Sequence, residues 1–117
     1  MNNKIFKIKK EELEDLIHPM GGCYATDSIT VEGNKVAVMI REEKAYEQDS
    51  GWFFMSGLEN QDYIDNPDNI MIYEVNTIAN YDRSIIPYLN YPIGSRFERC
   101  TGSDEFELIE DSSKIIS

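Results

Sequence analysis

The sequence is poor in basic residues and has no long apolar run. Eleven lysines and arginines stand against 22 acidic residues, so the formal charge is −11. Nucleic acids and anionic lipid surfaces select basic proteins, so we expect neither nucleic acid nor membrane among the partners. Runs of about 18 apolar residues, which a membrane span requires, are absent. Residues 1–10 also lack the apolar centre of a secretory signal, and we therefore expect a cytoplasmic protein.

Cysteine and histidine are equally scarce. The two cysteines, Cys23 and Cys100, lie far apart in the sequence, and we expect free thiols rather than a disulfide. With one histidine, His18, and no Cys-x-x-Cys spacing, we expect no metal site. A Ser-His-Asp or Cys-His catalytic set would depend on His18, which we interpret as a surface or capping residue. We therefore predict a protein without catalytic residues or cofactors.

The apolar content is sufficient for a small core. Leucine, isoleucine, valine and phenylalanine make up 29 of the 117 residues, above the level typical of disordered chains. The length corresponds to one domain over residues 1–117. Short strand-like and helical segments follow one another. We predict an α+β fold, with a mostly antiparallel sheet of about five strands and short helices packed against it.

The predicted elements are short. Apolar residues at helical spacing indicate a helix over residues 11–17, and further helices are expected within 60–65, over 76–80 and over 84–89, with Ser84 as an N-cap. Gly33-Asn34 predicts a hairpin between two strands within residues 23–43. Residues 52–55 are apolar on both faces, which is typical of a central strand, and 70–74 form another strand. Residues 96–100 and 106–109 are expected to form a terminal hairpin, followed by a loose tail after residue 110.

The acidic residues are unevenly distributed. Residues 42–82 contain ten acidic residues and one lysine, and residues 104–111 add five acidic residues and no base. Residues 59–69 do not fit an EF-hand loop, because isoleucine and proline occupy positions that need a ligand and glycine. They form either a solvated acidic loop or a partner-facing surface. Tyr63 and Ile64 among the carboxylates favour the surface, and a basic protein is the expected partner. The predicted partner-binding residues are Glu59, Asp62, Tyr63, Asp65 and Asp68.

Tyrosines and asparagines form a second group. Half-buried tyrosines that bridge core and solvent account for most of such a pattern. A small-molecule pocket is the other interpretation, and it would make the chain a small regulatory or ligand-binding module. The predicted pocket residues are Tyr73, Asn76, Asn80, Tyr81 and Tyr88.

Five segments occur in an order that is typical of one family. They are 49–54 (DSGWFF), 65–70 (DNPDNI), 73–82 (YEVNTIANYD), 84–89 (SIIPYL) and 94–99 (GSRFER). With these segments the chain resembles the bacterial immunity protein 33 domain family, also called domain of unknown function 2185, over about residues 22–100. The resemblance implies a non-catalytic immunity protein of a polymorphic toxin system, which binds and neutralises a cognate toxin. It supplies no catalytic residues and leaves open whether the protein is a monomer or a weak dimer.

The residue types in two of these segments predict structural roles. Asp49-Ser50-Gly51 and Asn66-Pro67 are turn-forming sequences, so we expect them to fix the fold. Trp52 is expected in the core.

Overall fold

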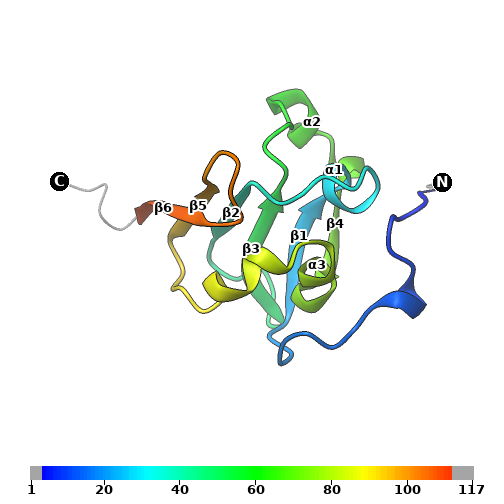
Figure 1. Ribbon diagram of the computed structural model, residues 1–117, viewed down its shortest axis with the longest axis horizontal. Coiled ribbons are helices and arrows are strands. Elements are labelled where there is room, and N and C mark those ends of the chain that lie inside the picture. The colour runs from blue at the N-terminus through cyan, green and yellow to red at the C-terminus, as the bar shows by residue number, and fades with distance from the viewer. Residues whose placement is uncertain (1–3, 112–117) are drawn as a thin grey trace.

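Six strands form one mixed sheet in the order β4-β1-β3-β2-β5-β6. The computed structural model describes residues 4–111 (Figure 1). The strands are β1 (Gly22–Thr26), β2 (Val38–Arg41), β3 (Asp49–Met55), β4 (Ile70–Glu74), β5 (Ser95–Arg99) and β6 (Phe106–Asp111). β1 and β3 are parallel, and the other neighbouring pairs are antiparallel. The predicted α+β class and mostly antiparallel sheet are confirmed, with six strands where about five were expected.

Short helices lie before and between the strands, and two of them cover one face of the sheet. They are η1 (Lys10–Glu12), α1 (Asp27–Thr30), α2 (Gln61–Asp65), η2 (Pro67–Asn69), α3 (Val75–Tyr81) and η3 (Arg83–Tyr88). Figure 1 shows α3 and the yellow η3 segment in front of β1 and β3. Alternate strand residues such as Cys23, Ala25 and Phe54 point to this face and are fully buried against Ile78 and Ile85 of the helices. The hydrophobic core therefore lies on one side of the sheet only.

β3 is the central strand that its apolar run predicted. It lies between β1 and β2, and Trp52 is fully buried in the core. The Trp52 indole N–H donates to the Leu89 carbonyl oxygen at 3.1 Å, and its ring stacks on Phe54 with centroids 5.9 Å apart. Phe53 and Met55 point to the other face of β3 and are half-buried rather than fully buried.

The hairpin predicted at Gly33-Asn34 does not form. β1 is followed by α1, and the turn after α1 leads to β2, which pairs with β3 and β5 but not with β1. Gly33 has a φ of +83°, so it does supply a tight turn, but the turn ends a helix. The amide of Asn34 donates to the carbonyl of Ser28 instead of to an opposing strand.

The prediction of a helix over residues 11–17 is also wrong. Only the 3-10 turn η1 forms, and Leu13 is already extended, with φ −73° and ψ 136°. The amides of Leu16 and Ile17 donate to the side chain of Asn76, so tertiary hydrogen bonds replace helical ones. Leu16 and Ile17 still pack against the core, as their apolar spacing requires.

Other local predictions agree with the structure more closely. The predicted helices within 60–65 and over 76–80 correspond to α2 and α3, and β5 and β6 form the terminal hairpin. The predicted helix over 84–89 is the 3-10 helix η3, whose N-cap is Asp82 rather than Ser84. The tail predicted after residue 110 lies outside the described residues from 112 onward.

The turn-forming segments fix the fold as expected. The buried carboxylate of Asp49 accepts hydrogen bonds from the amides of Ala45 and Gly51. Gly51 has a φ of +90°, and a Cβ atom there would collide with the Glu42 carbonyl. Asn66 accepts from the Asp68 amide at 3.0 Å and so starts η2.

Candidate functional site

The acidic segment of residues 59–69 is shaped by asparagine side chains. Asn60 Oδ1 accepts from the Tyr63 amide at 2.8 Å and caps α2, while Asn66 caps η2. Asn69 Nδ2 donates to the Tyr63 carbonyl at 3.0 Å and ties the two short helices together. The carboxylates of the segment are therefore presented from a locally defined backbone.

Glu59 is bonded inside the protein. Its carboxylate accepts hydrogen bonds from the Thr26 hydroxyl at 2.5 Å, from the Ser56 amide at 2.8 Å and from the Gly57 amide at 2.9 Å. Burial alone would raise the pKa of Glu59, but the hydrogen bonds from Thr26 and Ser56 outweigh it, and the net pKa is lowered. This carboxylate joins the end of β3 to β1, which is a structural function.

The other predicted surface residues differ in exposure. Asp62, Asp65 and Asp68 are exposed, and Asp65 also accepts a hydrogen bond from Gln61 at 2.7 Å. Tyr63 is half-buried with its hydroxyl inside the protein, and burial raises the pKa of that hydroxyl. Of the five predicted residues, the three aspartates are therefore the ones that face solvent.

A groove borders the acidic segment on the face of the sheet that α3 and η3 leave open. It has a volume of about 740 Å³. Tyr24 of β1 and Phe53 of β3 form its floor, Ile72 of β4 lies at one side, and Ile64 and Asp65 belong to the acidic segment. The groove thus combines an apolar floor with a carboxylate at its edge.

Most side chains of the predicted pocket contact residues 4–21, here called the N-terminal arm. Asn76 accepts from the amides of Leu16 and Ile17 and donates to the Glu14 carbonyl at 2.8 Å. Asn80 bonds both the amide and the carbonyl of Glu14 at 2.9 Å. These amide side chains pair with the arm much as a neighbouring strand would.

The tyrosines of this group divide between two places. The Tyr81 hydroxyl accepts from the Ile8 amide at 3.2 Å. Tyr73 meets Phe6 of the arm edge to face and bonds Thr30, and burial raises the pKa of Tyr73 to about 12. Tyr88 instead packs on Phe97 and Phe106 at the C-terminal hairpin. The structure therefore does not gather the five predicted residues around one pocket.

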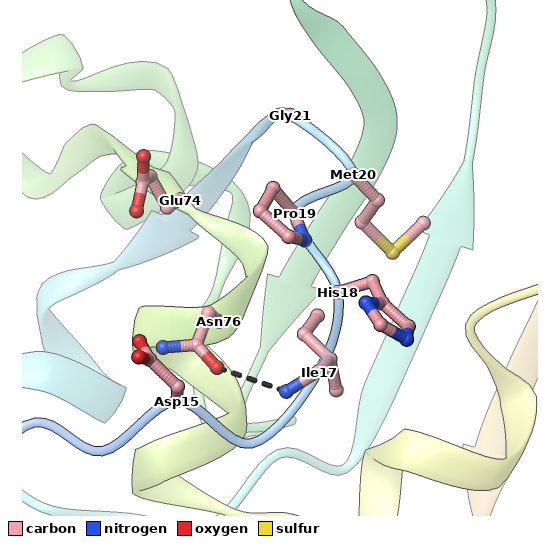
Figure 2. Close-up of a pocket in the computed structure, with 8 residues that line it drawn as sticks. All are labelled: Asp15, Ile17, His18, Pro19, Met20, Gly21, Glu74 and Asn76. Atoms are coloured by element: carbon pink, nitrogen blue, oxygen red, sulfur yellow. Dashed lines mark hydrogen bonds between the residues drawn. The ribbon is translucent and has the colours of Figure 1, made fainter.

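Asn76 does line a smaller cavity of about 330 Å³ between the arm and the start of α3. Figure 2 shows Asp15 and Glu74 on one side of it and His18 and Met20 on the other. The residues that line it include no serine, threonine or cysteine, so the lining offers His18 no hydroxyl or thiol nucleophile. The dashed contact in Figure 2 is the hydrogen bond between Asn76 and Ile17.

The chemistry available elsewhere is limited. Both cysteines are free, as expected, and burial raises the pKa of the Cys23 thiol, which makes it a poor nucleophile. Among residues 4–111, no group of three or more histidine, cysteine or acidic side chains is arranged to hold a metal ion. In the same range, no helix has the length and apolar character needed to cross a bilayer.

Sequence reasoning missed the groove. Its signal was present in the alternation of β1 and β3, where Tyr24 lies between buried Cys23 and Ala25, and Phe53 lies between buried Trp52 and Phe54. The apolar residues on both faces of 52–55 were interpreted as typical of a central strand. In β1 and β3 such residues also mark one packed face and one open apolar face.

The fold is a small α+β domain, and the open face of its sheet carries a groove that is lined by apolar side chains and two carboxylates. A family model, described as the immunity protein Imm33 domain, matches residues 23–110. The chain belongs to this family, which implies a cognate toxin as partner, and the resemblance found in the sequence is confirmed. The N-terminal arm lies outside the matched residues. No curated protein and no solved structure matches the chain.

Proposed function

We propose that this chain is a cytoplasmic, non-catalytic immunity protein that neutralises a cognate toxin by binding it. Family membership over residues 23–110 carries the proposal. The exposed aspartates Asp62, Asp65 and Asp68 support a basic toxin as the partner, because a concentrated negative surface speeds association with a positive one. Glu59 is left out of the proposed contact set because its carboxylate is used within the fold.

A capture experiment tests the function. The tagged chain is used to recover proteins from a lysate of its source cell, and each recovered protein is expressed alone and together with the chain. The proposal expects a recovered protein that stops growth when expressed alone and is harmless in the presence of this chain. Recovery of no toxic protein, or toxicity that the chain leaves unchanged, would contradict it.

Charge reversal tests the acidic surface. The double variant Asp62→Lys/Asp68→Lys should associate with the recovered toxin about tenfold more slowly at low salt, and its rate should depend less on salt. The matched control reverses two exposed acids elsewhere, Glu11→Lys/Glu107→Lys. Rates that fall equally in both double variants would indicate net charge alone and would exclude a specific role for the segment.

The alternative of a ligand-binding module is not favoured. The polar groups that would line such a pocket bond the N-terminal arm, notably through Asn76 and Asn80.

A further inference from the structure

A row of apolar side chains crosses the open face of the sheet. The strand register pairs Ile72 with Tyr24, Tyr24 with Phe53, and Phe53 with Ile40. Directly paired residues point to the same face, so these four side chains lie side by side across β4, β1, β3 and β2. The Tyr24 and Phe53 rings meet edge to face with centroids 6.4 Å apart. A sheet face that only meets water ordinarily carries polar residues at such positions.

The row remains accessible to a partner. Ile72 is 55% exposed, and Tyr24, Ile40 and Phe53 are each half-buried. Towards α2 and η2 the row opens into the groove of about 740 Å³ described above. The residues that line this groove include the carboxylates of Glu42 and Asp65 and no lysine or arginine.

We infer that this groove receives an apolar side chain of a basic protein segment, with lysine or arginine on either side of that chain. That this basic segment belongs to the toxin rests on the function proposed above. Charge complementarity selects this occupant, because Glu42 and Asp65 line the groove without a lysine or arginine, and the nearby Asp62 and Asp68 are exposed. The apolar side chain gains by leaving water for the row of Tyr24, Phe53 and Ile72. The flanking cations meet Glu42 and Asp65.

A second copy of this chain is a poorer occupant. It would bring another strongly negative surface against the same carboxylates, and like charges brought together at an interface oppose binding.

A peptide titration tests the groove without the toxin. The probe is a pentapeptide with a central phenylalanine and two basic residues on each side, followed by amide NMR of the ¹⁵N-labelled chain. We expect shifts centred on Tyr24, Phe53 and Ile72, about tenfold weaker binding when serine replaces phenylalanine, and no binding when glutamates replace the basic residues. Shifts centred elsewhere, or equal affinity of the phenylalanine and serine peptides, would overturn the inference.

Two isoleucine variants provide the matched comparison. Ile72→Asp changes the groove, and Ile93→Asp changes an isoleucine that is similarly exposed, at 42%, in the turn before β5. Ile72→Asp should weaken binding of the phenylalanine peptide about tenfold, and Ile93→Asp should leave the affinity of this peptide unchanged. Melting curves verify that both variants are folded. Equal effects of the two substitutions would overturn the assignment.

The toxin recovered by capture separates this inference from the proposed function. If Ile72→Asp neutralises the recovered toxin as strongly as the wild type does, the inference about the groove is overturned and the proposed function stands. Peptide binding in the groove without any recovered toxin would contradict the function and leave the groove standing. If the chain forms a dimer that Ile72→Asp dissociates, and no peptide binds, the inference is overturned and a second copy is the occupant of the groove.

Discussion

Replacing Glu59 by glutamine should destabilise the protein, although it removes a charge from a strongly acidic segment. Three hydrogen bonds converge on this carboxylate, from Thr26, Ser56 and Gly57. A hydrogen bond to a charged group contributes roughly 1.5–3 kcal/mol. Because the side chain is partly exposed and glutamine keeps one oxygen acceptor, we expect a loss of about 2 kcal/mol in the free energy of unfolding. For a chain of this length, that corresponds to a melting temperature lower by about 6–12 °C.

The effect should depend on pH in a defined direction. Although burial would raise the pKa of Glu59, hydrogen bonding lowers it in the folded state. The stabilisation is therefore complete above the unfolded-state pKa, at about 4.3, and is lost as the pH falls through the lower folded-state value. The stability difference between the wild type and Glu59→Gln should be largest near neutral pH and should shrink below about pH 4.

Thermal unfolding followed by circular dichroism, from neutral pH down to about pH 3.5, measures this difference. Glu43→Gln is the matched control, because it removes the same charge from an exposed residue that should contribute little. Equal melting of Glu59→Gln and the wild type at neutral pH would refute the reasoning. A difference that stays constant down to the lowest pH would also refute it, since the effect would then not depend on the ionised carboxylate.

Two further predictions concern the arm and the C-terminal hairpin. Asn76→Ala should speed the hydrogen exchange of the backbone amides of residues 16–17 about tenfold, because these amides lose their acceptor. The control Asn90→Ala should leave this exchange unchanged. Equal exchange rates in Asn76→Ala and the wild type would mean that other contacts fix the arm. Arg99→Met leaves the buried Asp82 carboxylate without its cation and should lower the free energy of unfolding, measured in urea, by about 3–5 kcal/mol. Adding Asp82→Asn should recover part of that loss, and simple additivity of the two losses would contradict a coupled pair.

The sequence was informative where local patterns decide the structure. The strand β3 and the terminal hairpin of β5 and β6 depend on residues that are neighbours in the sequence, and both were predicted. In the acidic segment, the helix predicted within residues 60–65 corresponds to α2, because Asn60 caps it from three positions away, whereas the 3-10 helix η2 was not predicted.

Prediction failed where distant residues decide the structure. The periodicity of residues 11–17 fits a helix, but backbone amides of this segment donate hydrogen bonds to Asn76 and Asn80, some 60 residues away, which hold it extended. The insertion of β3 between β1 and β2 likewise has no local signal, because the two strands that it separates are adjacent in the sequence. The same long-range order decides which residues line the groove, so the alternation of β1 and β3 could indicate an apolar outer face but could not locate the groove.

The uncovered sheet face also affects how copies of this protein behave toward one another. An apolar row that crosses four strands would favour stacking of two molecules face to face, because stacking removes that row from water. At neutral pH the charge of −11 on each molecule opposes such an approach. Near the isoelectric point, about pH 4.4, this repulsion disappears while the apolar row remains. The excess of acidic residues therefore serves as a barrier to self-association, which a sheet open on one side requires.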